Sequence, residues 1–286
     1  MAAHTASRRI LIVDDDLALC YILAGLLQAV GHVVEQATTG FDAMARLDAG
    51  AYDIVLLDVG LPDVSGLDVL AHARGMASPP IVIMMTADDT PETLLAAIRR
   101  QAYRYLRKPF APATIVQIAD EAMANRSAAQ PIEVVSALPE WVELVVPCVL
   151  EMADRIQLFV MQLDTTMPEP VRESVAQAFH ELMTNAIEWG GKLDPQRKVR
   201  IACVRTERML LYRIADPGEG FNIDELRHAA INNPPADPMK HAIVREQEGI
   251  RPGGLGLLIS RSLVDEVIYN EKGNEVMLIK YLDREP

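Results

Sequence analysis

The chain has 286 residues, of which 50% are hydrophobic and 23% are charged, so we expect a folded protein of about two domains. Its net charge of -13 argues against a nucleic-acid partner, because phosphate contacts require a basic surface. Three widely separated cysteines (Cys20, Cys148 and Cys203) indicate reduced core thiols and a cytoplasmic setting. No apolar run is long enough for a membrane span or a signal peptide, so we expect a soluble protein with no direct membrane contact.

Residues 1–125 alternate between short apolar runs and helix-like segments. The apolar runs are typical of buried parallel strands, and the segment at residues 17–30, ended by Gly31, is typical of a helix. Strands are expected at residues 9–14, 33–36, 54–58, 81–86 and 104–106. The alternation predicts an α/β domain with a doubly wound, five-stranded parallel sheet.

Polar residues fall at the carboxyl ends of these strands, where ligand sites of such sheets collect: Asp14, Asp15, Asp58, Thr86 and Lys108. Three neighbouring carboxylates repel one another and favour a divalent cation with oxygen ligands, most simply Mg²⁺. A metal beside an exposed carboxylate also suits it to attack a phosphoryl group, with a lysine to neutralise the oxygens. A purely structural role is the alternative for each residue alone, with Asp14 to Asp16 as helix caps and Lys108-Pro109 as a turn.

Residues 8–125 resemble the receiver domain of bacterial response regulators. The resemblance lies in the order and spacing of Val13-Asp14-Asp15-Asp16, Asp58 to Gly66, Thr86-Ala87 and Lys108-Pro109-Phe110. It implies that Asp58 accepts a phosphoryl group from a sensor histidine kinase, and that Asp15, Asp58 and the Gly60 carbonyl bind Mg²⁺ with help from Asp14. It also implies that Thr86 and Lys108 contact the phosphoryl oxygens and that Tyr105 changes rotamer with Thr86. Gln101 departs from the family, which often has glycine there, and this departure could alter the turn into the last strand.

A small, polar stretch ending in proline predicts a linker at residues 126–131, between a first domain at 1–125 and a second at 132–286. In the second domain we expect helices at 149–163 and 171–189, and strands at 141–146, 199–204, 209–215, 266–270 and 275–281. Residues 222–252 contain few large apolar side chains, which is typical of a functional lid or a disordered loop.

The predicted helix at 171–189 contains His180-Glu181-Leu182-Met183-Thr184-Asn185, which has two interpretations. The histidine could accept a phosphoryl group, or the acid and the amide could hold magnesium and a nucleotide. At about 100° per residue, the apolar side chains form one stripe. The stripe comprises Val171, Val175, Ala178, Phe179, Leu182, Ala186 and Trp189. Glu181 and Asn185 lie together at its edge and His180 lies nearly opposite, which favours the nucleotide interpretation and leaves His180 exposed or packed against a partner.

Two glycine clusters follow this helix. Asp216-Pro217-Gly218-Glu219-Gly220 comes directly after a strand and combines a carboxylate acceptor with a backbone that a planar ligand can approach, although such a segment alone more often forms only a turn. Gly253-Gly254-Leu255-Gly256-Leu257 begins an apolar helix that runs to about Val264, and backbone amides at a helix start bind phosphates.

Glu181-x-x-x-Asn185, Asp216-x-Gly218-x-Gly220 and Gly254-x-Gly256 together resemble the ATP-binding domain shared by histidine kinases, Hsp90-type chaperones and anti-sigma serine kinases. The resemblance covers about residues 132–286 and implies an α/β sandwich, with a mixed sheet covered by helices on one face. By this resemblance Asn185 binds Mg²⁺, Asp216 reads the adenine amino group of ATP, and Gly218 and Gly220 shape the pocket. The residues implied to hold the phosphates are Gly253, Gly254, Leu255, Gly256 and Leu257.

A histidine kinase of the usual kind has its acceptor histidine in a two-helix element ahead of the ATP domain, but residues 131–179 contain no histidine. The segment up to Asn185 resembles instead the anti-sigma-factor serine kinases of partner-switching systems. This resemblance implies that Glu181 is the general base for a serine or threonine hydroxyl. It also implies an anti-anti-sigma substrate, a competing sigma factor and a homodimer. Trp189 departs from that family, which commonly has histidine there, and this puts partner contacts in doubt.

The leading hypothesis is therefore a response regulator whose serine/threonine kinase output is controlled by phosphorylation of Asp58. Two alternatives remain. One is a histidine kinase-type enzyme that acts on a separate acceptor protein. The other is a receiver-gated, ATP-dependent interaction module without catalysis.

Overall fold

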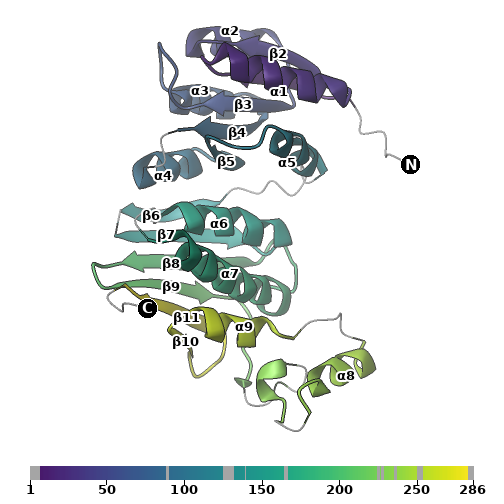
Figure 1. Ribbon diagram of the computed structural model, residues 1–286, viewed down its shortest axis with the longest axis vertical. Coiled ribbons are helices and arrows are strands. Elements are labelled where there is room, and N and C mark those ends of the chain that lie inside the picture. The colour runs from purple at the N-terminus through teal and green to yellow at the C-terminus, as the bar shows by residue number, and fades with distance from the viewer. Residues whose placement is uncertain are drawn as a thin grey trace. The chain divides into compact units, whose positions relative to one another are not determined.

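The computed structural model describes residues 7–87, 90–124, 132–138, 140–163, 167–223, 226, 229–234, 237–249 and 254–282. The chain forms two compact units, Met1–Gln130 and Pro131–Pro286 (Figure 1). The predicted linker at 126–131 and Gly253 lie outside the described residues. Within the ranges given above, no helix has the length and apolar character needed to cross a membrane.

The first unit is a five-stranded parallel sheet with the strand order β2-β1-β3-β4-β5. Its strands are β1 (Arg9–Val13), β2 (Val33–Ala37), β3 (Ile54–Asp58), β4 (Ile81–Thr86) and β5 (Arg104–Arg107). The helices between them are α1 (Leu17–Ala29), α2 (Gly40–Ala49), α3 (Gly66–Arg74), α4 (Pro91–Arg99) and α5 (Ala113–Ala124). The predicted doubly wound parallel sheet is confirmed, and the ends of β1, β2 and β5 differ from the prediction by one residue.

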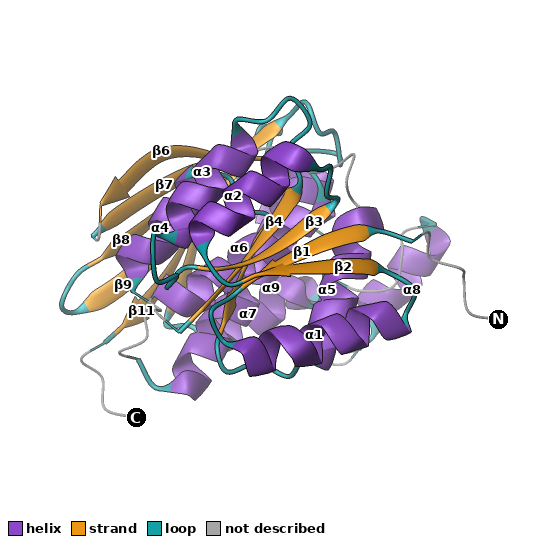
Figure 2. Cartoon of the chain, turned by 90° about the horizontal axis from the view of Figure 1, so that it is seen from above, coloured by secondary structure: helices purple, strands orange, loops and turns teal. Residues whose placement is uncertain are grey.

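Helices cover both faces of this sheet. Figure 2 shows α1 on one face and α2 and α3 on the other. The residues of β1 that face α1 and α5 are Ile10 and Ile12, and they form one buried cluster with Leu23 of α1 and Ile115 of α5. Because both faces are covered, β3 and β4 are buried at every position, which explains why they read as continuous apolar runs.

The second unit is a six-stranded sheet with the order β10-β11-β9-β8-β7-β6. Its strands are β6 (Glu133–Leu138), β7 (Trp141–Pro147), β8 (Lys198–Arg205), β9 (Met209–Ala215), β10 (Glu266–Tyr269) and β11 (Glu275–Tyr281). Its helices are α6 (Leu150–Leu163), α7 (Glu169–Asn185), a π-helical turn at Ala186–Gly190, a 3₁₀ turn at Ala230–Asn232, α8 (Lys240–Gln247) and α9 (Gly256–Leu263). The helices α6, α7 and α9 cover one face of this sheet (Figure 1), which confirms the predicted α/β sandwich.

The expected mixed sheet is wrong for the described strands, since all of their pairings are antiparallel. The connection from β7 to β8 contains two helices, α6 and α7, that pack on each other. A pair of antiparallel helices returns the chain to the end of the sheet from which it left. The next strand therefore runs antiparallel to the previous one, where a single crossover helix would make it parallel.

The long predicted helix at 171–189 ends as an α-helix at Asn185 and continues as a π turn over Ala186–Gly190. Most of the predicted buried stripe is correct, because Val175, Ala178, Phe179, Leu182 and Ala186 are buried. Val171 is only partly buried, and Trp189 is 48% exposed. A π turn holds more residues than an α turn, so the 100° projection fails beyond Asn185 and Trp189 leaves the stripe.

Two elements were not predicted. β6 is an edge strand with an irregular register between Val134 and Ser136, so its apolar alternation is weak. α8 lies within the stretch predicted to be irregular, and it begins without a side-chain cap at Met239. The helix predicted to begin in the second glycine cluster begins at Gly256.

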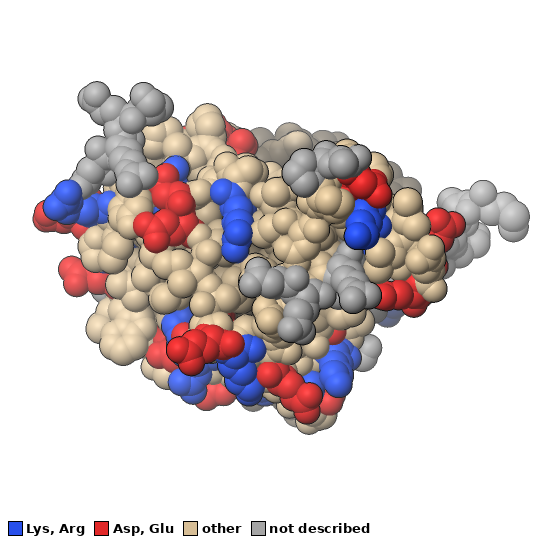
Figure 3. Space-filling model, turned by 90° about the horizontal axis from the view of Figure 1, so that it is seen from below, with Lys and Arg blue, Asp and Glu red and all other residues tan. Residues whose placement is uncertain are grey.

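On the face seen in Figure 3, lysine and arginine side chains lie beside aspartate and glutamate side chains. Basic and acidic side chains are therefore mixed on this face.

Candidate functional sites

The acidic residues after β1, Asp14 to Asp16, have two different roles: one caps a helix and the other two join a carboxylate cluster. Asp16 caps α1, and its carboxylate accepts hydrogen bonds from the N–H groups of Ala18 and Leu19 at 2.9 and 3.1 Å. Asp14 is fully buried, Asp58 at the end of β3 is nearly so, and Asp15 is exposed. One carboxylate oxygen from each of Asp14, Asp15 and Asp58 lies within 4.8 Å of the other two. This cluster fits a hard divalent cation, which would offset the repulsion among three acids.

Lys108 joins the same cluster from the end of β5. Its Nζ lies 2.6 Å from Asp14 Oδ2 and 3.0 Å from Asp58 Oδ1. Burial lowers the pKa of Lys108, but its hydrogen bonds to Asp14 and Asp58 outweigh burial and the pKa is raised overall. Burial raises the pKa of Asp14, and the hydrogen bond from Lys108 opposes this only in part. The lysine is thus held as a cation beside the carboxylate predicted to accept the phosphoryl group.

The loop after Asp58 is shaped by glycines. The Gly60 N–H donates to Asp58 Oδ2 at 3.2 Å, and a Cβ atom on Gly66 would lie 1.9 Å from the Asp58 carbonyl oxygen, so only glycine fits there. Thr86 ends β4 beside this loop and is buried, as is Tyr105 of β5. The rotamer coupling of Thr86 with Tyr105 stays a prediction.

Two residues of the first unit, Asp63 and Gln101, have structural roles in loops. Asp63 accepts hydrogen bonds from the Gly40 and Phe41 N–H groups at 2.7 and 2.8 Å, which ties the loop after Asp58 to the start of α2. Gln101 adopts a left-handed backbone with φ of 61°, and Arg74 donates to its Oε1 at 2.6 Å. The turn that favours glycine is therefore kept with glutamine in place.

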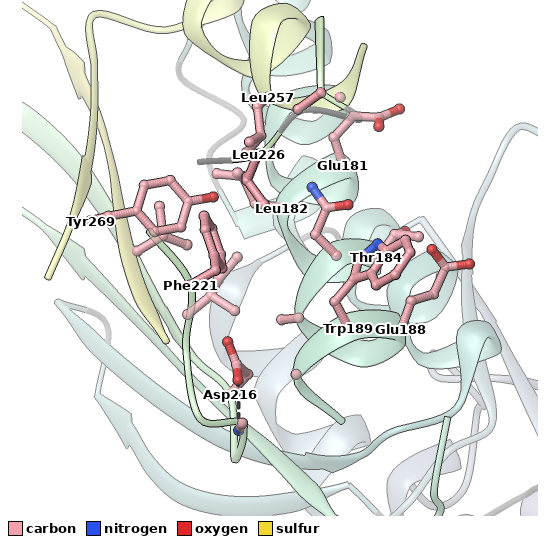
Figure 4. Close-up of a pocket in the computed structure, with 18 of the residues that line it drawn as sticks. Glu181, Leu182, Thr184, Glu188, Trp189, Asp216, Phe221, Leu226, Leu257 and Tyr269 are labelled. Carbon is pink, nitrogen blue, oxygen red and sulfur yellow. Dashed lines mark hydrogen bonds between the residues drawn. The ribbon is translucent and has the colours of Figure 1, made fainter. Parts of the chain in front are cut away.

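The second unit contains a cavity of about 620 Å³ next to α7, within the range of small-molecule sites. Its lining includes all the predicted binding residues in the described part of the chain: Glu181, Asn185, Asp216, Gly218, Gly220, Gly254, Leu255, Gly256 and Leu257. Figure 4 shows Glu181 near Leu257 at one end of this cavity and Asp216 at the other.

At the first end, α9 begins against α7. A Cβ atom on Gly256 would lie 2.6 Å from Glu181 Oε2 and 3.7 Å from Asn185 Nδ2, so the first residue of α9 touches both side chains. Gly254 has a φ of 95°, and its carbonyl accepts a hydrogen bond from the Ala230 N–H at 2.8 Å. The start of a helix close to an acid and an amide suits an anion that carries a divalent metal.

At the second end, Asp216 follows β9 and accepts a hydrogen bond from the Gly218 N–H at 2.7 Å. Burial raises the pKa of Asp216, and the hydrogen bond from Gly218 works against this. A Cβ atom on Gly190 would lie 2.1 Å from Asp216 Oδ1, so the end of the π turn packs directly on the carboxylate. The result is a single acceptor in a glycine-walled slot, which suits a planar ligand with an amino group.

Several cavity residues were not anticipated from the sequence. Phe221 and Tyr269 form an edge-to-face pair with ring centroids 5.2 Å apart (Figure 4). Arg245 of α8 lines the cavity although it is only 6% exposed, and Trp189, which is 48% exposed, lines it as well. No sequence motif joins these residues, because they come from separate elements that meet only in the fold.

His180 lies on another side of α7. Its Nε2 is 2.9 Å from Asp154 Oδ1 on α6, and the ring is partly exposed. His180 is absent from the cavity lining, in agreement with the helix projection, but its contact with Asp154 of α6 was not predicted.

Comparisons with known proteins agree with both units. Residues 10–120 match the family model of the response regulator receiver domain, and residues 135–280 match that of the histidine kinase-like ATPase domain. The transcriptional regulatory protein ZraR of Salmonella typhimurium is 33% identical over 116 residues, 41% of this chain and 26% of that protein. The transcriptional regulatory protein TcrA of Mycobacterium tuberculosis is 38% identical over 102 residues, 36% of this chain and 40% of that protein.

This chain therefore spans less than half the length of these two relatives. A solved CheY-like receiver domain from Methanospirillum hungatei is 27% identical, with 44% of this chain and all of that chain covered at a TM-score of 0.42. The chain belongs to the histidine kinase-like ATPase family, and a response regulator receiver domain precedes its ATPase domain in the sequence.

Proposed function

We propose that this chain is a response regulator whose output is an ATP-dependent serine/threonine protein kinase of the anti-sigma type. Phosphorylation of Asp58 controls that output. The observation that carries the proposal is the single cavity of about 620 Å³ that Glu181, Asn185, Asp216 and the glycines of 254–256 line together.

In this proposal the ends of the cavity have different tasks. Bound Mg²⁺–ATP supplies the phosphoryl group, with Asn185 as a metal ligand and the start of α9 beside the phosphates. Glu181, in contact with Gly256, accepts the proton of a serine or threonine hydroxyl. Asp216 accepts a hydrogen bond from the adenine amino group. These roles need an acid, an amide and a second acid spread along one cavity, which is the observed arrangement.

The receiver domain supplies the input. A sensor histidine kinase is the phosphoryl donor, Asp58 is the acceptor, and Asp14, Asp15, Asp58 and the Gly60 carbonyl hold Mg²⁺. Lys108 is already 3.0 Å from Asp58 Oδ1, so its ammonium group is in place to neutralise a phosphoryl oxygen.

In this proposal the phosphoryl group of ATP is transferred to a separate protein. Residues 131–179 contain no histidine, and His180 pairs with Asp154 on α6. From the resemblance of the segment up to Asn185 to anti-sigma serine kinases, we propose an anti-anti-sigma protein as the substrate and a sigma factor as the competing partner.

The test mixes the full chain with labelled ATP and a candidate anti-anti-sigma protein, with and without acetyl phosphate. Acid-stable label on the partner, altered by acetyl phosphate in the wild type but not in Asp58→Asn, is the expected result. Glu181→Gln should bind ATP and lose transfer. Acid-labile label would point to a histidine kinase-type enzyme. Nucleotide-dependent complex formation without transfer, unchanged in Glu181→Gln, would favour the non-catalytic interaction module.

A further inference from the structure

The turn between β10 and β11 lies directly against the turn that carries Asp216. β11 pairs with β9 in antiparallel register, with Glu275 opposite Ala215. The residues just outside this pair, Asn274 and Asp216, therefore also meet, and the Asp216 N–H donates to the Asn274 carbonyl at 2.9 Å. The register of the sheet thus brings a second turn, residues 270–274, to the end of the cavity that holds Asp216.

The side chain of Asn274 extends this contact. Its Nδ2 lies 3.5 Å from the carbonyl oxygen of Asp216 and 3.4 Å from that of Gly218, which are long hydrogen bonds. Lys272 Nζ lies 3.4 Å from the same Gly218 carbonyl. Gly218 in turn donates its N–H to the Asp216 carboxylate at 2.7 Å. The backbone that holds the carboxylate is thus held by the 270–274 turn.

Asn270 orients the Asn274 amide. Asn270 Nδ2 donates to Asn274 Oδ1 at 3.1 Å, and Asn270 Oδ1 accepts from the N–H groups of Gly273 and Asn274 at 2.7 and 3.1 Å. Because the oxygen of the Asn274 amide faces Asn270, its NH₂ group faces the two carbonyls of the Asp216 turn.

The two turns also touch through their backbones. A Cβ atom on Gly273 would lie 1.9 Å from the Phe221 carbonyl oxygen, and one on Gly220 would lie 1.8 Å from the Lys272 carbonyl oxygen. Both glycines have positive φ, 76° and 85°. No residue with a side chain fits at either position without moving one turn away from the other.

We propose that the 270–274 turn positions the nucleobase-reading carboxylate in this chain, with Asn274 as the main positioning residue and Asn270 as its orienting partner. Asn274 is not among the residues that line the cavity, so it acts through Asp216 and Gly218. Arg197 also donates to the Pro217 carbonyl at 2.7 Å, so a second segment of the chain holds the Asp216 turn. This inference rests on the proposed nucleotide function and extends its base-recognition site to a segment outside the glycine motifs.

Asn274→Asp in the full chain tests the proposal. The substitution keeps the shape of the side chain and replaces the NH₂ donor with an oxygen that faces two carbonyl oxygens. We expect ATP to bind about tenfold or more weakly, the scale of one lost hydrogen bond to a charged group. Inosine triphosphate lacks the amino group that Asp216 would read, so its affinity should stay within about twofold and the preference for ATP should fall.

Two further variants complete the design. Asn274→Ala removes the amide without adding charge and should lower the preference for ATP in the same direction. Gln157→Glu makes the same amide-to-acid change on α6, outside the cavity lining, and should leave both affinities unchanged.

Equal weakening of both nucleotides by Asn274→Asp would show a general loosening of the domain and overturn the positioning role, as would an unchanged preference for ATP. A wild-type chain that binds neither nucleotide would overturn the proposed function itself. Wild-type binding without a preference for ATP would overturn the base-reading role of Asp216 and this inference together.

Discussion

Gly190→Ala tests the contact between the π turn and Asp216. A Cβ atom at residue 190 would lie 2.1 Å from Oδ1, 2.2 Å from Cγ and 2.5 Å from Cβ of Asp216. Non-bonded carbon atoms prefer about 3.5 to 4.0 Å, so the contact to Cγ must open by roughly 1.3 Å or more. Rotation about the Cα–Cβ bond of Asp216 moves the carboxylate but not its Cβ atom, so a backbone must shift as well.

That shift displaces the carboxylate from its hydrogen bond with the Gly218 N–H. In the proposed function the displaced carboxylate also loses its hydrogen bond with the adenine amino group. A hydrogen bond to a charged group contributes about 1.5 to 3 kcal/mol, so ATP should bind roughly 10- to 150-fold more weakly. Calorimetric titration with ATP measures the loss, and circular dichroism checks that the variant is folded. Gly25→Ala on α1 is the matched control, because open space surrounds that position. ATP affinity within about twofold of wild type in folded Gly190→Ala would refute the steric argument.

Three other substitutions probe separate contacts. Gly256→Ala brings a Cβ atom to 2.6 Å from the flexible end of the Glu181 side chain. ATP binding should persist while phosphoryl transfer falls by about 10²-fold, because Glu181 is the proposed general base. Binding and transfer are measured in parallel, and equal losses of both would contradict this role of Glu181. Residue 101 has a left-handed backbone, which alanine adopts less easily than glycine. In urea unfolding the Gln101→Ala variant should therefore be about 1 kcal/mol less stable than the Gln101→Gly variant, and the reverse order would show that the backbone at residue 101 is not strained. The hydrogen bonds from Arg213 lower the pKa of Glu275 in the folded protein. The pair therefore stabilises the fold fully at pH values above the pKa of Glu275 in the unfolded chain, near 4.3. This contribution disappears as the pH falls through the lower pKa of Glu275 in the folded protein. In urea unfolding, Glu275→Gln should lower the free energy of unfolding by about 0.5 to 1 kcal/mol at pH 7 and by little at pH 3. Equal losses at the two pH values would show that the ion pair with Arg213 does not stabilise the fold.

The receiver site could be predicted closely because parallel strands end at a common edge. Once β1 and β3 are recognised as buried apolar runs and β5 as the parallel strand that ends just before Lys108, Asp14, Asp58 and Lys108 must meet there. The divided role of the acidic run was harder to foresee, since Asp16 as the α1 cap and Asp15 in the metal cluster have the same chemistry in the sequence. The path of the backbone after β1 decides which of these two carboxylates joins the metal cluster and which caps α1.

The lining of the cavity in the second unit could be predicted where a glycine motif or the α-helical repeat marks it in the sequence. Glu181 and Asn185 lie one α-helical turn apart, and the projection placed them correctly, but the π turn after Asn185 moved Trp189 out of the predicted stripe. The contact of Asn274 with Asp216 depends on the β9–β11 register, which pairs segments about sixty residues apart and leaves no local signal in the chain.

The π turn also provides an intrinsic fluorescence probe for the cavity, because it contains Trp189. The sequence has only two tryptophans, and the turn leaves Trp189 48% exposed in the cavity lining. The other, Trp141 on β7, lies outside the cavity lining. A chain with Trp141→Phe therefore has a single tryptophan, located in the cavity lining, and occupancy of the cavity can be followed by intrinsic fluorescence without any attached dye.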